Sequence, residues 1–389
     1  MNVLISGAGI AGLTTAYWLH ERGLNPTVVE RADDIRDGGY KVDIRGTAVE
    51  VIRRMGLLDE VRELRTEVRE ATFVDKDGAT VATMDADLFG GRHDEDVEIL
   101  RGDLAQLLYE RLRGKVEFVF GDSIVDISDD GSGVRVAFEH GTERRFDYVV
   151  GADGLRSTTR RLVFGDGNVR ELGYYVSIFD VPNHLGLDRA ERTYVEPGRT
   201  ALMYSTRGDT KAKAMFMFAS EPLDYSRRDA AEQRAILARA FAGAGWEVPT
   251  LIAAAQDADG FYFDSLSLVE LDRWSRGRVV LTGDAAYCAS PASGQGTSLA
   301  LVGAYVLANE MAEGGFDRYE TLMRDFVAAN QKLGPENVRG MVIAKKWQIR
   351  AQLTVLRLLP KLPGKEKMAG RIADKIHRAA TAITLKDYA

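Results

Sequence analysis

The chain has 389 residues, a length that can hold two domains or one large composite domain. Apolar residues make up 45% and charged residues 28%, as in soluble globular proteins, and a net charge of −7 argues against a nucleic-acid binder. Cys288 is the only cysteine and the five histidines are scattered, so we expect no disulfide and no metal centre. Because no apolar run approaches 18 residues and no basic segment precedes the first one, we expect a cytoplasmic protein without a membrane segment.

The first thirty residues carry the strongest pattern in the chain. Residues 3–5 form an apolar run typical of a buried parallel strand, and residues 13–22 predict a helix. Residues 27–29 predict a second strand, which ends in Glu30. The turn between the first strand and the helix is Gly7-Ala8-Gly9-Ile10-Ala11-Gly12. Strand, glycine-rich turn, helix, strand and acid in this order predict a dinucleotide-binding unit, without distinguishing NAD(P) from FAD.

Each part of this unit has a physical role. Gly7 allows the tight turn, Gly9 lets a pyrophosphate approach the backbone, and Gly12 lets the helix pack closely on the strand. The first N–H groups of the helix face the phosphate charge. Glu30 can accept two hydrogen bonds from the adenosine ribose, worth about 1.5–3 kcal/mol each.

Two later strands also end in an acid within a turn of small residues, one at Asp153 and one at Asp284. Ligands of open α/β sheets bind beyond the carboxyl ends of the strands, so both carboxylates are placed to meet one. A solvated turn residue is the alternative for Asp153. Residues 291–298 then lead into a helix, whose N-terminus can approach a ligand closely at Gly294 and Gly296 and stabilise negative charge on it.

The segments between these motifs give weaker signals. Residues 31–46 form a loop-like stretch with paired glycines at Gly38 and Gly39, which lies either against the cofactor or on the surface. Arg101 comes just before a predicted helix, and an ordinary surface ion pair is the alternative to a ligand contact there. Three strands predict a β-meander inserted into the dinucleotide fold, at residues 116–120, 124–127 and 134–139.

Residues 174–267 are β-rich and aromatic, which predicts an antiparallel sheet. A sheet face rich in Met and Phe is typical of a core, but a large flat apolar substrate needs such a wall too. The substrate candidates are Met203, Phe216, Phe263 and Asp264, the last of which has a strand-end turn residue as its alternative. The basic segment from Met341 predicts helices docked on the body, with attachment to a membrane surface as the alternative.

Three motifs together resemble the group A flavoprotein monooxygenases, the single-component aromatic hydroxylases typified by p-hydroxybenzoate hydroxylase. Residues 7–12 with Glu30 are similar to the ADP-binding fingerprint of that family. Residues 151–160 are similar to its DG motif, which is associated with both FAD and NAD(P)H, and residues 283–286 to its GD motif, whose aspartate binds the flavin ribityl chain. The resemblance covers residues 1 to about 330.

The compact length and the stretches 38–43 and 99–104 look most like the tetracycline-inactivating branch of that family. By that likeness Asp43 and Arg101 contact FAD. One position departs from the family pattern, because Tyr287 follows the GD motif where His is commoner.

The resemblance implies an α/β fold: a Rossmann-like FAD-binding domain with a parallel sheet and an inserted β-meander, a β-rich substrate domain and a C-terminal helix. We expect residues 1–172 and 268–330 to form the FAD-binding domain, 173–267 the substrate-binding antiparallel sheet, and 331–389 the C-terminal helical segment. Arg45 and Arg160 are candidates for binding NADPH or NADH. The expected FAD-binding residues are Gly7, Gly9, Ala11, Gly12, Glu30, Arg31, Asp43, Arg101, Asp153, Gly283, Asp284, Pro291, Gly294, Gly296 and Thr297.

The resemblance also implies an activity. NAD(P)H reduces FAD, O2 adds to the reduced flavin, and the C4a-hydroperoxide transfers one oxygen atom to the substrate. The aromatic middle region favours a planar, multi-ring substrate such as an aromatic polyketide or antibiotic. No residue pattern identifies a catalytic acid or base, and oligomeric state is not predicted.

Three alternatives share FAD binding with this prediction. A dehydrogenase or reductase of the same superfamily would use NAD(P)H or a substrate hydride without inserting oxygen. A flavin-dependent halogenase carries a Trp-x-Trp motif, which none of the four tryptophans here forms. A catalytically idle FAD-binding protein would show no NAD(P)H oxidation stimulated by a substrate.

Overall fold

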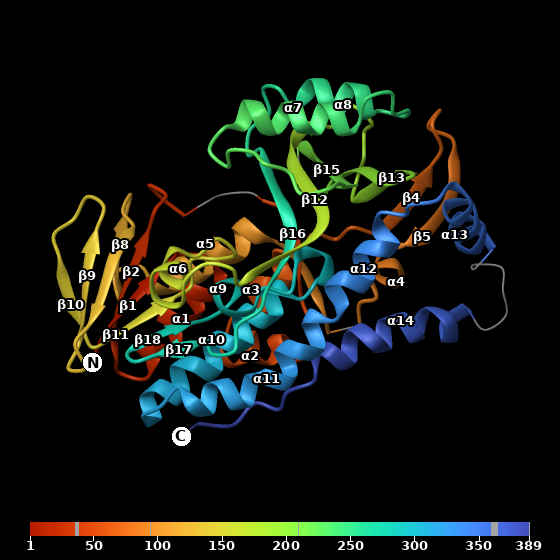
Figure 1. Cartoon of the computed structure of the whole chain (residues 1–389). Helices are drawn as coiled ribbons and strands as arrows, with labels where there is room; N and C mark the ends of the chain where they lie inside the picture. The colour runs from red at the N-terminus through yellow and green to blue at the C-terminus, as the bar shows by residue number, and fades with distance from the viewer. Residues whose placement is uncertain (36–38, 94, 209, 359–364, 389) are drawn as a thin grey trace.

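The computed structural model describes residues 1–35, 39–93, 95–208, 210–358 and 365–388 (Figure 1). Residues 36–38 of the loop predicted at 31–46 lie outside the described residues, as do residues 359–364 and 389 of the predicted C-terminal helical segment. The chain is α/β, with one mostly parallel sheet, one large mostly antiparallel sheet and helices packed around both.

A six-stranded sheet forms the base of the molecule, and its central strands are parallel. β1 pairs with β2 and β11, β11 pairs with β18, and β2 pairs with β7, all in parallel, so the carboxyl ends of these strands meet at one edge. In spatial order the strands are β17 (Ser275–Arg276), β18 (Val279–Leu281), β11 (Tyr148–Gly151), β1 (Asn2–Ser6), β2 (Asn25–Glu30) and β7 (Glu117–Phe120).

The two faces of this sheet are covered differently, because successive side chains of a strand point to opposite faces. Val3 and Ile5 pack in the cluster formed with the helices, whereas Leu4 packs in the cluster of the small antiparallel sheet. The helices against this sheet include α1 (Ile10–Glu21), α5 (Arg101–Leu112) and α10 (Gly296–Glu313). The small sheet consists of β8 (Ile124–Asp129), β9 (Val134–Phe138) and β10 (Arg144–Phe146).

The inserted meander differs from its predicted outline. The first of the three predicted strands, residues 116–120, contains β7, which extends the parallel sheet beside β2. The meander instead takes its third strand from β10, which pairs with β9. Both segments are short and half apolar, so only long-range pairing decides which sheet they join.

The second large sheet has seven strands, and all its pairs are antiparallel except β13 with β4. In order they are β16 (Tyr262–Val269), β12 (Val169–Pro182), β15 (Lys211–Ala219), β14 (Arg199–Tyr204), β13 (Ala190–Glu196), β4 (Glu70–Val74) and β5 (Thr80–Asp85). Thus β4 and β5, from the segment predicted to belong to the FAD-binding domain, extend the sheet of the middle segment. The proposed domain boundaries follow the chain and do not capture this exchange.

The two faces of the seven-stranded sheet have different neighbours, and we call them the outer and the inner face. α7 (Ala230–Ala240) and α8 (Val248–Ala254) lie over one face, on the side away from the parallel sheet (Figure 1). The inner face packs on η1 (Pro291–Ser293) and α12 (Leu333–Met341). The inner face therefore looks toward the loops at the carboxyl ends of the parallel strands.

The remaining elements connect and enclose these layers. β3 (Lys41–Ile44) and β6 (Val97–Leu100) form an antiparallel pair. The other helices are α2 (Thr47–Arg54), α3 (Leu58–Glu63), α4 (Ala86–Gly90), α6 (Thr158–Phe164), α9 (Asp284–Tyr287), α11 (Asp317–Gln331), α13 (Lys346–Leu358) and α14 (Lys365–Ala380). α14 contacts α11 and α4, while α13 contacts β5 and β13. No helix in the described part of the chain has both the length and the apolar character that crossing a membrane needs.

Candidate functional site

The turn after β1 has the geometry that its glycines predict. Gly7 has a φ of +103°, and a Cβ on it would lie 2.7 Å from the carbonyl oxygen of Ala152. A Cβ on Gly12 would lie 1.9 Å from the carbonyl oxygen of Gly7, so α1 can pack this closely only with glycine there. By contrast, the nearest atom to a Cβ on Gly9 would be Arg101 Nη2 at 3.6 Å. The backbone at Gly9 is therefore open toward Arg101, next to the first N–H groups of α1.

Glu30 lies at the carboxyl end of β2, beside this turn. Its carboxylate accepts hydrogen bonds from the N–H groups of Ala8 and Ala32, both at 2.9 Å. These bonds tie the end of β2 to the glycine-rich turn. Arg31, the next residue, is exposed.

Asp153 lies in the turn after β11. It accepts hydrogen bonds from the Thr159 N–H at 2.9 Å, from the Thr159 hydroxyl at 3.1 Å and from the Ser157 hydroxyl. The carboxylate therefore holds the start of α6, a structural task that the sequence alone did not separate from ligand contact.

Arg160, predicted to contact NAD(P)H, is buried instead. Its guanidinium donates to the carbonyl oxygens of Ala285 at 2.9 Å and Leu155 at 2.6 Å. Burial lowers the pKa of Arg160, against the nearby charge of Asp153. The side chain joins the turn after β11 to the turn after β18, and this position argues against contact with a cofactor that must arrive and leave.

The turn after β18 holds Gly283, which packs closely against another part of the chain, and Asp284, whose carboxylate is accessible. Gly283 has a φ of +58°, and a Cβ on it would lie 2.7 Å from Ala11 Cβ, so the turn after β18 touches the first turn of α1. Asp284 begins α9 and keeps an accessible side chain. The protein around the carboxyl nevertheless desolvates it and raises its pKa, against the nearby charges of Arg101 and Arg160. Accessible surface together with desolvation is expected of a group that faces a recess.

Tyr287, which stands where the resembled family more commonly has His, points into the core. It is buried, and its hydroxyl lies 3.1 Å from Thr282 Oγ1 and 3.0 Å from the Tyr319 hydroxyl. A Cβ on Gly303 of α10 would lie 1.9 Å from the Tyr287 hydroxyl oxygen, so this helix makes room for the phenol. The substitution therefore changes packing behind α9.

Glycines with open backbones lie next to three charged side chains of this region, those of Arg101, Asp43 and Asp284. A Cβ on Gly39 would lie 3.6 Å from Arg101 Cβ, one on Gly294 4.0 Å from Asp43 Oδ2, and one on Gly296 3.9 Å from Asp284 Oδ1. Gly296 begins α10, with Thr297 buried in its first turn and Pro291 exposed in η1 before it. Together with Gly9, these positions outline one cradle that ordinary side chains would narrow.

A chain of buried charges runs along one side of this cradle. Asp43 Oδ1 lies 2.7 Å from Arg92 Nε and Asp43 Oδ2 2.8 Å from Arg45 Nη2. Arg92 also bonds Glu98, and Lys41 lies 3.7 Å from Glu98. Burial alone would raise the pKa of Asp43, but the two guanidinium groups outweigh it and hold that pKa well below its usual range.

Lys41 continues the chain of charges to the seven-stranded sheet, because its ammonium lies 2.9 Å from Glu191 of β13. Burial alone would raise the pKa of Glu191, but Lys41 outweighs it and the pKa is lowered. The named members, three acids and three bases, balance in charge. They tie β3 to β6 and to the sheet above.

Arg45, the other NAD(P)H candidate, is a member of this chain of charges and only 4% exposed. Besides Asp43, its guanidinium bonds the carbonyl oxygens of Gly90 and Gly91, each at 2.9 Å. A phosphate contact would require breaking these bonds, so the geometry argues against that prediction.

Three of the predicted substrate residues lie on the outer face of the seven-stranded sheet. Met203, Phe216 and Phe263 pack in the core beneath α7 and α8, and the first two are fully buried. The predicted wall is therefore displaced by one residue, since a shift of one position moves a side chain to the opposite face.

The inner face of the sheet carries the neighbouring residues instead. Met215 and Met217 pack on this side with Tyr40, and Tyr262 lies 6.3 Å from Tyr40 between ring centroids. Tyr262 is 38% exposed although its surroundings desolvate the phenol and raise its pKa well above the ordinary value. Residues 215 and 262 alternate with the predicted Phe216 and Phe263, so period-two alternation was the signal that could have identified them.

Asp264 shares the inner face with Tyr262. It is 9% exposed and paired with Arg156 of the turn after β11, at 2.8 Å. The Arg156 Nη2 also donates to the Ser265 hydroxyl at 2.7 Å. This ion pair bridges the sheet to the turn that carries Asp153.

Comparisons with known proteins agree with this geometry. Residues 1–315 match the sequence family described as FAD binding domain. A flavin-dependent monooxygenase of Legionella longbeachae is 39% identical over 342 residues, 86% of this chain and 88% of the relative. An uncharacterized protein of Mycobacterium tuberculosis is 44% identical over 349 residues, 87% of this chain and 94% of the relative. The crystal structure of tetracycline destructase Tet(51) superposes with a TM-score of 0.87 at 35% identity, covering 100% of this chain and 99% of that one.

Proposed function

The chain belongs to the family of flavin-dependent monooxygenases built on this FAD-binding domain, and we propose that it uses NAD(P)H and O2 to hydroxylate an aromatic or polycyclic small molecule. The proposal rests on the arrangement of two surfaces, the cradle and the inner face of the seven-stranded sheet. The cradle outlined by Gly9, Gly39, Gly294 and Gly296 lies on one side, and the tyrosine-bearing inner face of the sheet lies on the other.

The cradle fits FAD, because its backbone is open where a Cβ would narrow it and its charged groups suit the parts of that cofactor. The first N–H groups of α1 would bind the pyrophosphate beside Gly9, and Glu30 would accept hydrogen bonds from the ribose. Asp284 and Arg101 would lie against the ribityl chain and the ring. Bound FAD supplies two-electron reduction by NAD(P)H and transfer of one atom of O2 to the substrate, while the other atom leaves as water.

The inner face of the sheet supports a planar substrate. Tyr40 and Tyr262 offer aromatic surface for stacking, and desolvation raises the pKa of both phenols, so they stay neutral and can donate hydrogen bonds. Met215 and Met217 supply an adaptable apolar wall. The likeness to a tetracycline destructase makes a fused-ring molecule of that type the first compound to test.

The chain's own residues would position the reactants and exclude water. The Asp264–Arg156 ion pair joins the inner face of the sheet to the turn after β11 and would border a substrate bound between the sheet and the cradle. The neutral tyrosine hydroxyls would orient oxygen or nitrogen substituents of the ring system. Substrate binding against this face would also displace water from the oxygen-transfer site, which prevents wasteful loss of the reactive oxygen.

The test combines flavin spectroscopy with turnover. The purified protein with FAD should have a flavin absorption spectrum that bleaches with NADPH and recovers in air, and tetracycline should accelerate NADPH consumption. Acceleration only by small monocyclic phenols would contradict the substrate class. Bound flavin that is reduced but yields no oxygenated product would favour the alternative, a dehydrogenase or reductase.

A matched pair of variants separates the proposed site from general damage. Asp284→Asn removes the accessible carboxylate of the cradle, and we expect weaker FAD binding. Asp166→Asn makes the same change at an exposed surface position and should bind FAD like the unmodified protein. Equal FAD affinity in the two variants would contradict the assignment of Asp284.

A further inference from the structure

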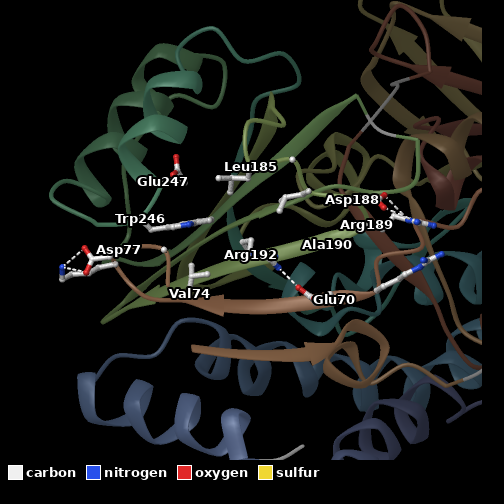
Figure 2. Close-up of a pocket in the computed structure, with 15 residues that line it drawn as sticks. Glu70, Val74, Asp77, Leu185, Asp188, Arg189, Ala190, Arg192, Trp246 and Glu247 are labelled. Carbon is white, nitrogen blue, oxygen red and sulfur yellow. Dashed lines mark hydrogen bonds and ion pairs between the residues drawn. The ribbon is translucent and has the colours of Figure 1, made fainter. Parts of the chain in front are cut away.

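A second cavity, of about 720 Å3, lies at the far end of the seven-stranded sheet, on its outer face (Figure 2). Its lining comes from β4, the turn between β4 and β5, the loop before β13, and the loop between α7 and α8. In Figure 2 the Trp246 ring, Leu185 and Val74 lie on one side, and the Arg192–Glu70 ion pair lies on another. The cavity therefore combines a flat aromatic wall with a paired set of charges.

This cavity is separated from the cradle by the thickness of the sheet. Ala190 and Arg192 of β13 line it, whereas Glu191 between them points to the opposite face and bonds Lys41. Successive residues of one strand thus serve the two faces separately. A ligand can occupy this cavity without entering the space above the cradle.

The charges of the lining balance. Four basic and four acidic residues line the cavity, and ion pairs join basic residues to acidic residues of the same lining. Arg192 lies 2.7 Å from Glu70, and Arg189 lies 3.1 Å from Asp188. A dinucleotide or a phosphate would need unbalanced positive charge, so this lining suits an uncharged or zwitterionic molecule.

The backbone around the cavity is held in unusual conformations. Among the described residues, four besides glycine have a positive φ, and two of them, Arg189 at +51° and Trp246 at +54°, line this cavity. A third, Glu67 at +53°, lies 3.2 Å from Arg189 Nη1. The fourth, Ser290, is in the loop before η1. Such conformations are uncommon for residues other than glycine, and they are found disproportionately at ligand and active sites.

Trp246 is held rigidly enough to serve as a wall. Its backbone N–H donates to the carbonyl oxygen of Lys76 at 2.6 Å, and its ring centroid lies 6.2 Å from that of Tyr194. A Cβ on Gly245 would lie 2.7 Å from Lys76 Cβ, so the chain can approach β4 this closely only with glycine there. The backbone at Trp246 is therefore held in place and its ring packs beside Tyr194, so less of the conformational entropy of this wall remains to be lost on stacking.

We propose that this cavity is a second ligand site, which binds a planar, uncharged or zwitterionic ring compound by stacking on Trp246. The ion pair of Arg192 and Glu70 on the floor provides both a donor and an acceptor for polar substituents of such a ring. The choice of probe rests on the proposed function, because tetracycline, a zwitterionic fused-ring compound near neutral pH, represents the proposed substrate class.

The test is equilibrium dialysis of the FAD-loaded protein with tetracycline in the absence of NADPH, so that no turnover occurs. We expect two equivalents to bind. Ala190→Phe fills the floor and should leave one, whereas Ala253→Phe, an equal change on the exposed surface of α8, should leave two. Trp246→Gly removes the indole while tolerating the positive φ, and should weaken the second site about tenfold.

The outcomes separate this proposal from the proposed function. If one equivalent of tetracycline binds and Ala190→Phe abolishes that binding, the result supports the second site and counts against binding of tetracycline at the flavin site. If one equivalent of tetracycline binds and neither Ala190→Phe nor Trp246→Gly changes that binding, the proposal of a second site is overturned. The absence of saturable binding overturns it too. The flavin spectrum of each variant verifies that it is folded. If Ala190→Phe does not fold, the affinity of Trp246→Gly decides.

Discussion

Lys41→Met removes the ammonium that joins the cradle strand β3 to the sheet above it. Glu191 is 6% exposed, and Lys41 is its partner at 2.9 Å, so the change leaves a buried carboxylate without its cation. Breaking a buried pair costs about 3–5 kcal/mol, and we expect about 3 because the Lys41 side chain is 19% exposed. Loss of the contact between the ammonium and the Tyr204 ring, 4.9 Å apart, adds about 0.5–1 kcal/mol.

Urea unfolding followed by flavin fluorescence and circular dichroism measures this effect. Lys76→Met is the matched control, because Lys76 and Asp77 form an ion pair of 2.7 Å in which both side chains are at least 70% exposed. An exposed pair contributes about 0–1 kcal/mol. The double variant Lys41→Met with Glu191→Gln should regain part of the lost stability, since it removes the unpaired charge. A loss below about 1 kcal/mol in Lys41→Met would refute the reasoning.

The pH dependence of the loss gives an independent check. In the unmodified protein the pKa of Glu191 is lowered, so its stabilisation is present above the unfolded pKa and is lost as pH falls through the folded pKa. Without Lys41, burial should instead raise this pKa, so that the carboxyl takes up a proton on folding. The deficit of Lys41→Met should therefore shrink as pH falls below about 6. A deficit that grows on acidification would point to a different cause.

Three further substitutions address the cradle and the inner face. Gly283→Ala meets a positive φ and a Cβ contact of 2.7 Å with Ala11, and should cost about 1–3 kcal/mol of stability and weaken FAD binding, measured by FAD titration. Glu30→Gln weakens its charge-assisted hydrogen bonds, so FAD should bind about tenfold less tightly, and unchanged affinity would count against a ribose contact. Tyr262→Ala should raise KM for tetracycline about tenfold, while Tyr262→Phe keeps the stacking surface and should raise it less; equal KM values would exclude stacking.

The sequence predicted those parts of the cradle that depend on local geometry. Gly7 and Gly283 have positive φ values, and each lies in a turn directly after an apolar strand. A stretch of about ten residues is therefore enough to predict both the strand and the glycine turn that follows it. The same short-range logic located Asp284 at the end of β18. These motifs converge in space because the carboxyl ends of parallel strands share one edge.

Other features depend on pairing that no short segment specifies. The strands β4 and β5 join the second sheet through the parallel pairing of β4 with β13, more than a hundred residues away in the chain. The face of β15 was assigned wrongly because Met215, Phe216 and Met217 are all apolar, which leaves the period-two register undefined. Arg45 and Arg160 were predicted to contact NAD(P)H, whereas carbonyl and carboxylate oxygens of the protein itself accept their hydrogen bonds. Such partners become visible only in the folded chain.

The most direct test of the proposed monooxygenase activity is isotopic. The FAD-loaded protein is incubated with NADPH and tetracycline under isotopically heavy O2, and the product is examined by mass spectrometry. The proposal predicts a product that gains one oxygen atom derived from the gas, with NADPH consumed in equal amount. A product whose added oxygen comes from water, or NADPH oxidation that yields only hydrogen peroxide, would contradict it.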